Sequence, residues 1–95
     1  MSIVWTPAGW DDVDRLHAFL AEHDLDAADA VFDQLLSAPD SLLHFPRRGP
    51  RLSQYDPREI REFQIGRYRM RYELNGPEIF ILRIFHSKED RFRPA

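Results

Sequence analysis

The stretch that decides the fold is residues 61–86, which read REFQIGRYRMRYELNGPEIFILRIFH. From Tyr68 as far as Leu74, apolar or aromatic side chains alternate with charged ones. Because successive side chains of a strand point to opposite faces, this alternation predicts a strand with one buried face and one basic face. The side chains expected on the buried face are those of Tyr68, Met70, Tyr72 and Leu74. The side chains expected on the open face are those of Arg67, Arg69 and Arg71.

Two further strands are predicted, one on each side of this strand in the sequence. Asn75-Gly76 is a strong hairpin signal, because both residue types tolerate a positive φ. Residues 79–85 are apolar apart from Arg83, which favours a central strand covered on both faces. Residues 60–65 form a third strand, joined to the next by a tight turn at Gly66. The C-terminal half is therefore predicted to be a three-stranded antiparallel meander.

The N-terminal half has the period of helices. Residues 3–5 are β-prone and predict a short strand at a sheet edge. Thr6 followed by Pro7 indicates a helix N-cap with proline at the first helical position. The first helix is expected over residues 7–23. Its buried stripe, at spacings of three and four, is expected to consist of Trp10, Val13, Leu16, Phe19 and Leu20.

A second helix is expected over residues 27–37, with Asp26 as its cap and Pro39 as its end. Its buried stripe is predicted to comprise Ala28, Val31, Phe32, Leu35 and Ala38. About three residues separate the two helices, so they should form an antiparallel hairpin. The hairpin is expected to end in a buried tail formed by Leu42, Leu43 and Phe45. A polar, proline-rich loop over residues 47–57 then leads into the meander.

The order strand, helix, helix, strand, strand, strand predicts one α+β domain over residues 1–95. In this arrangement the N-terminal strand lies at a sheet edge. The antiparallel helix hairpin must cover one face of the C-terminal antiparallel sheet, because its apolar stripes have no other surface to bury. The opposite face should carry the arginines, and we expect it to be the surface that meets a partner.

The composition excludes several classes of protein. The chain has no cysteine, so we expect no disulfide and no thiol nucleophile, which fits a reducing cytoplasm. No signal-peptide pattern and no apolar run near 20 residues is present, so no membrane association is expected. Residues 1–46 carry a net charge of −8 and residues 47–95 a net charge of +5. Such a bipolar molecule can offer a cationic face to an acidic partner.

No metal or cofactor site is expected. Three histidines, His17, His23 and His44, lack metal-ligand spacing with a third ligand. The acidic run at Asp11, Asp12 and Asp14 lacks the glycine and terminal glutamate of a calcium loop, and complements the positive end of the first helix instead. The chain also has no glycine-rich phosphate loop.

Several short sequence motifs in the second half of the chain resemble those of a known family. They are Arg61-Glu62-Phe63, Gly66-Arg67-Tyr68-Arg69, Tyr72 and Leu82-Arg83-Ile84-Phe85-His86. With the helix hairpin before them, the chain resembles the RelE/ParE superfamily of bacterial toxins from type II toxin–antitoxin pairs, from Ile3 to Arg91. The resemblance implies a RelE/ParE-like fold and an antitoxin that neutralises the toxin by binding it.

The superfamily has two branches, and the motifs of this chain are more similar to those of the ParE branch. RelE- and YoeB-like members cut messenger RNA in the ribosomal A site, whereas ParE-like members poison DNA gyrase without catalysis of their own. Arg69 matches the strand arginine of the cutting branch, and His86 falls near the histidine of YoeB-like members. Glu62 stands where RelE-like members of that branch have a lysine, and Glu89 stands where they have a tail arginine. Arg51 stands near the position at which YoeB-like members have their glutamate. A carboxylate in place of a phosphate-binding cation repels the substrate of the cutting branch.

Three hypotheses follow from the resemblance. The first is a ParE-like toxin that inhibits DNA gyrase in the cytoplasm and forms a hetero-oligomer with a cognate, ParD-like antitoxin. The antitoxin's C-terminal segment would fold as a helix or strand along the hairpin and sheet edge. The arginines expected to bind partners in this case are Arg67, Arg69, Arg71 and Arg83.

The second hypothesis is a ribosome-dependent endoribonuclease, for which the expected catalytic residues are Arg61, Arg69 and His86. The third is a relative that binds its partner but has lost toxicity. Each candidate residue also has a structural alternative. His86 could bond to the backbone at a strand end. Arg69 or Arg61 could instead pair across strands with Glu62, Glu73 or Glu78.

Overall fold

The computed structural model of the chain describes residues 1–87. The tail over residues 88–95, including the Glu89 named above, lies outside the described residues. The elements in chain order are β1 (Ser2–Trp5), α1 (Pro7–Ala21), α2 (Leu25–Ser37), α3 (Asp40–His44), a 3₁₀ turn (Ser53–Tyr55), β2 (Glu59–Ile65), β3 (Tyr68–Asn75) and β4 (Glu78–His86).

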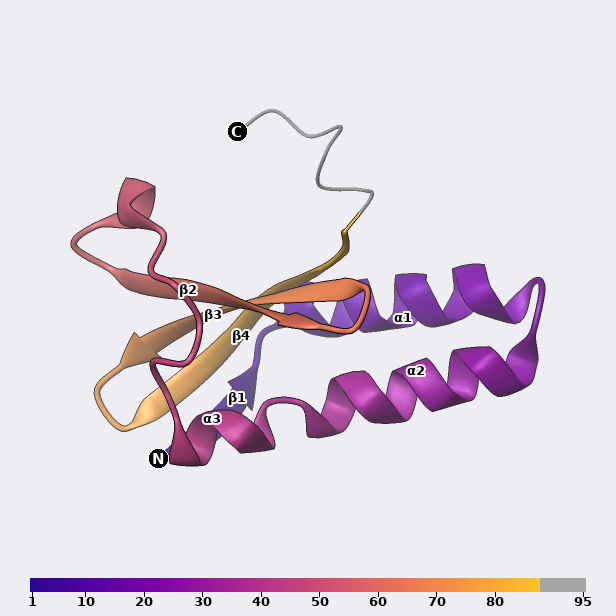
Figure 1. Cartoon of the computed structure of the whole chain (residues 1–95), viewed down its shortest axis with the longest axis horizontal. Helices are drawn as coiled ribbons and strands as arrows, with labels where there is room; N and C mark the ends of the chain where they lie inside the picture. Colours follow the sequence, from indigo (N-terminus) through magenta and orange to yellow (C-terminus); the bar gives the residue numbers. More distant parts are fainter. Residues whose placement is uncertain (88–95) are drawn as a thin grey trace.

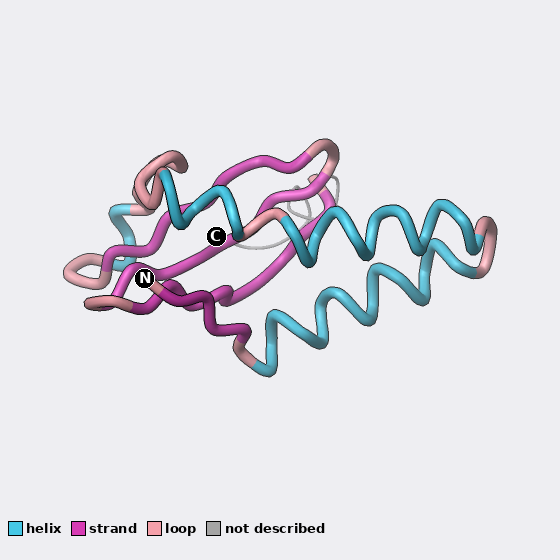
Figure 2. Tube along the Cα trace, turned by 90° about the horizontal axis from the view of Figure 1, so that it is seen from below, coloured by secondary structure: helices cyan, strands magenta, loops and turns pink. Residues whose placement is uncertain are grey.

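The four strands form one mixed sheet in the order β1-β4-β3-β2. β1 pairs with β4 in parallel, and the other two pairs are antiparallel. The helices α1 and α2 cover one face of this sheet as a hairpin whose far end projects past the strands (Figures 1 and 2). The predicted α+β fold, with an edge strand and a helix hairpin on one sheet face, is confirmed.

The core lies between the hairpin and the sheet. Its buried members from the helices are Val13, Leu16, Leu35 and Leu42. Its buried members from the strands are Phe63, Tyr68, Met70, Tyr72, Ile79, Ile81 and Ile84, with Leu74 packed against them. Full burial of one such side chain stabilises the fold by about 1.5–3 kcal/mol, so this layer supplies most of the driving force for folding. The predicted buried face of the strand over Tyr68–Asn75 is confirmed.

Helix α1 begins as predicted and then lies close against β4. The Thr6 hydroxyl accepts a hydrogen bond from the Gly9 backbone N–H at 3.1 Å, which caps the helix. The same hydroxyl donates to the Ile81 carbonyl at 2.7 Å and so ties the cap to the sheet. A Cβ at Gly9 would lie 2.7 Å from that carbonyl oxygen, so glycine is needed for this close approach.

Helix α2 starts two residues earlier than predicted, and its cap is Asp24 rather than Asp26. Asp24 has an extended backbone, and its carboxylate accepts from the Ala27 N–H at 3.1 Å. Asp26 lies in the first turn, where it complements the helix dipole instead. Pro39 follows the end of α2 and stands at the N-cap position of the short helix α3, in the segment that was expected to be a buried tail of the hairpin.

Several apolar side chains expected in the core are exposed. Phe19 is 63% exposed, Phe45 is 70% exposed, and Trp10 and Leu43 are each about two fifths exposed. Helical spacing defines a stripe but not how far along the helix the sheet extends, and the hairpin extends beyond the sheet (Figure 1). In the short helix α3, only Leu42 is completely buried.

Strand β4 contains a bulge that the sequence reading did not predict. Arg71 pairs with Arg83 while Tyr72 pairs with Ile81, so Leu82 is an extra residue. Strict alternation from Ile81 would place Arg83 under the helices, and the bulge turns it to the opposite face. The expectation that β4 is covered on both faces is wrong, because Leu82 and Arg83 are only partly buried.

Candidate partner-binding face

We call the sheet face turned away from α1 and α2 the open face. By the strand register it comprises Ile60, Glu62, Gln64, Arg69, Arg71, Glu73, Phe80, Arg83 and Phe85. Three of the four arginines predicted to bind a partner are therefore on one face. The fourth, Arg67, lies with Gly66 in the β2–β3 turn and is exposed, so its expected place on a strand face is wrong. The alternation of charged and apolar residues in the sequence includes Arg67, although this residue belongs to the turn and not to β3.

Arg71 is the centre of the open face. Its Nε donates to Glu62 Oε2 at 2.9 Å, and its Nη1 donates to the Tyr55 hydroxyl at 3.1 Å. Its guanidinium lies over the rings of Phe85 and Tyr55, 5.1 and 5.6 Å from their centroids. The side chain is only 20% exposed, so it lies along the sheet rather than projecting from it.

Glu62 joins Arg71 to its neighbour on the same strand. Arg69 Nη1 lies 3.4 Å from Glu62 Oε1, and the Glu62 carboxylate is buried between the two arginines. This is the cross-strand pairing raised as a structural alternative in the sequence reading, and for Arg69 it is confirmed. A shared buried carboxylate fixes both guanidinium groups in one geometry. Its negative charge neutralises half of their combined positive charge.

Arg83 is held by a carboxylate from helix α1. Its Nε donates to Asp12 Oδ2 at 2.7 Å and its Nη2 to Asp12 Oδ1 at 3.2 Å. Asp12 Oδ2 also accepts from the Ile84 backbone N–H at 2.8 Å. Arg15, one turn further along α1, lies 3.4 Å from Asp12 Oδ1. The buried Asp12 carboxylate thus takes the place of a strand partner at the edge of β4 beyond the short β1.

The sequence reading missed Asp12, which it assigned to the helix dipole together with its neighbours. Asp12 and Arg83 are 71 residues apart, so no local pattern joins them. One signal was present: Asp12 stands four residues before the buried Leu16, so the helical period places it on the core-facing stripe.

The network leaves the open face cationic. Four arginines, Arg15, Arg69, Arg71 and Arg83, are paired with only two carboxylates, Asp12 and Glu62. The guanidinium groups are held in place by these ion pairs and, for Arg71 and Arg83, by contact with the Phe85 ring. Because this geometry is set in advance, little further side-chain entropy would be lost if such a surface bound an acidic partner.

The residues expected to catalyse RNA cleavage do not form one cluster. Arg61 pairs with Tyr72 on the helix side of the sheet, while Arg69 is on the open face. His86 pairs with Tyr68, four residues from Tyr72 along β3 and therefore roughly 13 Å away at the rise of a strand. His86 packs edge-to-face on the Tyr68 ring, 5.3 Å between centroids. A base and a phosphate-binding cation should instead meet within hydrogen-bond reach of one substrate.

Arg61 binds the loop that precedes β2. Its Nε donates to Glu59 at 2.8 Å and its Nη1 to the Gly49 carbonyl at 2.8 Å. Arg47 also binds Glu59, and hydrogen bonding from Arg47 and then Arg61 lowers the pKa of that carboxyl. The Tyr72 hydroxyl donates to the Pro46 carbonyl at 2.7 Å. Arg61 is therefore a structural residue that fixes this loop on the sheet.

The comparison with known families decides the class. The model of the family described as "ParE toxin of type II toxin-antitoxin system, parDE" matches residues 3–91. The chain belongs to this family. A solved chain described as "Chromosomal ParDE TA system from P. aeruginosa" superposes with a TM-score of 0.76 at 20% identity, covering 90% of this chain and 95% of that chain. No curated protein matches the sequence.

The predicted kinship with the RelE/ParE superfamily and its ParE branch is confirmed by the family match. The protein is a ParE-type toxin of a type II toxin–antitoxin system. Within residues 1–87, no helix of this ParE-type toxin is long and apolar enough to cross a membrane. Over the same residues, no three potential metal ligands gather in one place.

Proposed function

We propose that this ParE-type toxin inhibits DNA gyrase by binding it, in the cytoplasm and without chemistry of its own. The observation that carries the proposal is the open face, where Arg69, Arg71 and Arg83 are held by Glu62 and Asp12 with positive charge in excess. A rigid, net cationic surface suits binding to an acidic macromolecular surface. The separation of Arg61, Arg69 and His86 favours binding over RNA cleavage.

A cognate antitoxin of the ParD type is the second proposed partner. Type II antitoxins act by binding their toxin, and this chain offers two surfaces of opposite charge to such a partner. The hairpin half carries a net charge of −8 and the sheet half +5. A flexible antitoxin segment that folds on the toxin could lie along the hairpin and reach the sheet edge. We expect the resulting complex to be a hetero-oligomer.

Arg67 lies in the β2–β3 turn, two residues before Arg69 of the open face, so a charge reversal there lowers the positive potential at the border of that face without breaking its ion pairs. Within residues 1–87 its side chain makes no ion pair or hydrogen bond, so Arg67→Glu should leave the fold unchanged. The matched control is Arg47→Glu, an exposed arginine whose partner Glu59 lies on the helix side of the sheet. Purified toxin at micromolar concentration should inhibit supercoiling by gyrase. Arg67→Glu should weaken that inhibition roughly tenfold, as expected for about 1.4 kcal/mol, and Arg47→Glu should not.

Two results would redirect the assignment. If supercoiling is unaffected while translating ribosomes yield codon-positioned cuts in messenger RNA, the protein is a ribonuclease of the RelE type. If cells that express the toxin alone grow normally and gyrase is not inhibited, the protein is a partner-binding relative without toxicity.

A further inference from the structure

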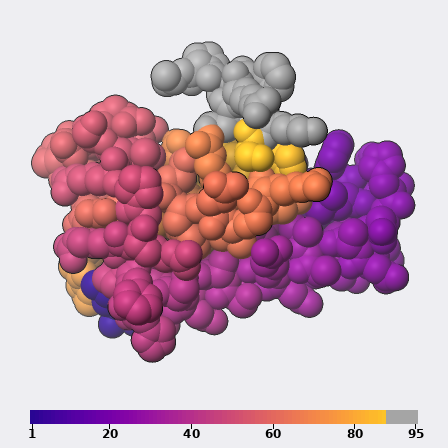
Figure 3. All heavy atoms as spheres, in the orientation of Figure 1, coloured from indigo at the N-terminus to yellow at the C-terminus, as the bar shows by residue number. Residues whose placement is uncertain are grey.

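Each end of the molecule exposes large apolar side chains. The α1–α2 turn lies at one end of the longest axis, and the end of α3 lies toward the other (Figure 1). The space-filling view shows the same separation, with the purple hairpin at one end and the magenta segment around α3 at the other (Figure 3). Near the α1–α2 turn, Phe19 is 63% exposed and Leu25 is 58% exposed. At the other end, Phe45 is 70% exposed directly after α3.

The apolar surface at the α1–α2 turn is surrounded by acids. We call it the hairpin tip, and it consists of Phe19, Glu22, His23, Asp24, Leu25 and Asp26, all of which are exposed. No lysine or arginine occurs in residues 16–46, so this part of the chain has no strong cation to balance the acids. The rings of Phe19 and His23 pack edge-to-face, 6.1 Å between centroids, which holds the Phe19 ring at the surface. Glu22 follows Phe19 by three residues and therefore lies on the same side of α1.

The apolar surface after α3 is hollowed and basic. A pocket of about 440 Å³, which we call the α3 pocket, is lined by His44, Phe45, Pro46, Arg47 and Arg48. A cavity of about 150 Å³ holds a benzene ring, so the α3 pocket has room for an aromatic side chain. Arg47 binds Glu59 at 2.9 and 3.1 Å, but the same carboxylate also accepts from Arg61. Two arginines share one acid there, and positive charge remains in excess.

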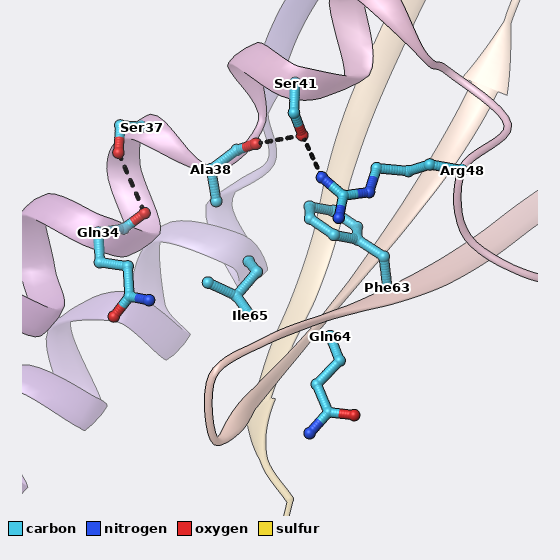
Figure 4. A pocket seen from close by; sticks show the side chains of 8 residues that line it. All are labelled: Gln34, Ser37, Ala38, Ser41, Arg48, Phe63, Gln64 and Ile65. Carbon is cyan, nitrogen blue, oxygen red and sulfur yellow. Dashed lines mark hydrogen bonds between the residues drawn. The ribbon is translucent and has the colours of Figure 1, made fainter.

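Arg48 is the cation of the α3 pocket with the most unused donors. It also lines a groove between β2 and α2, where its Nη1 donates to the Ser41 hydroxyl at 2.8 Å (Figure 4). Its guanidinium lies 4.7 Å from the centroid of the Phe63 ring, so both contacts hold it in place. A guanidinium has five N–H donors, and within residues 1–87 the side chain of Arg48 makes one hydrogen bond. It is therefore positioned to bind a carboxylate.

We propose that the hairpin tip of one copy of this toxin docks into the α3 pocket of a second copy. The Phe19 ring enters the pocket against Phe45. The Glu22 carboxylate binds the Arg48 guanidinium at the rim of the pocket. Burial of the two aromatic side chains supplies the affinity, and the ion pair sets the orientation of the two copies.

Charge complementarity decides which surfaces meet. Two hairpin tips repel each other because both are acidic, and two α3 pockets repel each other because both are basic. A tip and a pocket attract, so the contact joins unlike ends of two copies. Such a contact is heterologous: every copy carries both surfaces, and copies can add in a row.

The test uses sedimentation velocity of the purified toxin alone, so its result is independent of gyrase and of any antitoxin. The two test variants reverse one charge on each surface. Glu22→Lys places a cation at the C-terminal end of α1, which the helix dipole favours, so the fold should tolerate it. Arg48→Glu reverses the charge at the pocket. The matched controls are Asp33→Lys, on α2 away from the turn, and Arg67→Glu, in the β2–β3 turn.

The average mass of the wild-type toxin should rise above that of the monomer from micromolar to submillimolar concentration, and rise less at high salt. Each test variant should weaken this association at least tenfold, whereas each control should change it less than threefold. The double variant Glu22→Lys/Arg48→Glu should associate again, because the two reversed charges attract. A wild type that stays monomeric, an association that survives both single reversals, or a double variant that stays monomeric would overturn the inference.

Disulfide trapping gives an independent readout, because the chain has no cysteine of its own. Asp26→Cys marks the hairpin tip and His44→Cys marks the α3 pocket. When the two variants are mixed and oxidised, the mixed disulfide should exceed the sum of the two homodimers. A statistical mixture, or an excess of either homodimer, would contradict the docking of the tip into the pocket.

Discussion

Removal of the Asp12 carboxylate is the perturbation whose effect the structure defines best. Asp12→Ala leaves the Ile84 N–H buried without its acceptor, which costs about 1–3 kcal/mol. It also removes the pairing with Arg83, whose side chain is 37% exposed and can return to water. An ion pair of this exposure contributes only about 1 kcal/mol. The free energy of unfolding should therefore fall by about 3 kcal/mol, or roughly 12 °C or more in Tm for a domain of this size.

Two further variants separate the parts of this effect. Asp12→Asn keeps an oxygen that accepts from Ile84 and loses only the charge, so it should cost about 1 kcal/mol. Asp11→Ala changes an exposed carboxylate in the same helix turn and should stay within about 0.5 kcal/mol of wild type. Urea unfolding followed by circular dichroism measures all three. If Asp12→Ala is no less stable than Asp11→Ala, the buried carboxylate does not tie α1 to β4 and the reasoning fails.

Three other predictions concern stability. Tyr72→Phe should lose about 1–2 kcal/mol in urea unfolding, because the hydroxyl is buried, which raises its pKa, and is hydrogen-bonded to the loop; an unchanged midpoint would refute this. Gly49→Ala should cost about 1–3 kcal/mol in the same assay, because its Cβ would collide with the Glu62 carbonyl; wild-type stability would show that the loop moves freely. Hydrogen bonding from Arg58 lowers the pKa of Glu73 in the folded state below the ordinary 4.5, so its contribution is present above that pH and lost on acidification; Glu73→Gln should flatten the fall in Tm below pH 4.5, and an unaltered acid limb would contradict the pairing.

Regular patterns in the sequence predicted the regular parts of the fold. The alternation around Met70 gave the two faces of β3, because a strand has a fixed period of two. Thr6 and Pro7 gave the start of α1, because capping depends on local chemistry alone. The bulge at Leu82 was not predictable in this way. It shifts the alternation by one residue, so that Ile84 lies in the core and Arg83 on the open face, and such a shift is visible only in the assembled sheet.

On the open face, too, some features followed from local sequence patterns and others only from the assembled fold. That arginines share a face followed from the alternation, but their pairing did not. The pairing of Glu62 with Arg71 could have been predicted, since the two residues are cross-strand partners in an antiparallel hairpin. The pairing of Asp12 with Arg83 could not, because it depends on how α1 crosses the edge of β4. The groove between β2 and α2 is likewise absent from any local pattern, since its walls come from α2, α3, the loop before β2 and β2 itself.

The most direct test of the account is the yield of gyrase–DNA cleavage complexes trapped by the toxin. Purified gyrase, supercoiled DNA and ATP are incubated with the wild-type toxin or Arg67→Glu, and linear DNA released by detergent and protease is quantified. The account predicts that the wild type traps linear DNA, that Arg67→Glu traps several-fold less, and that equimolar antitoxin abolishes the signal. No linear DNA and no loss of supercoiling with a folded wild-type toxin would contradict it.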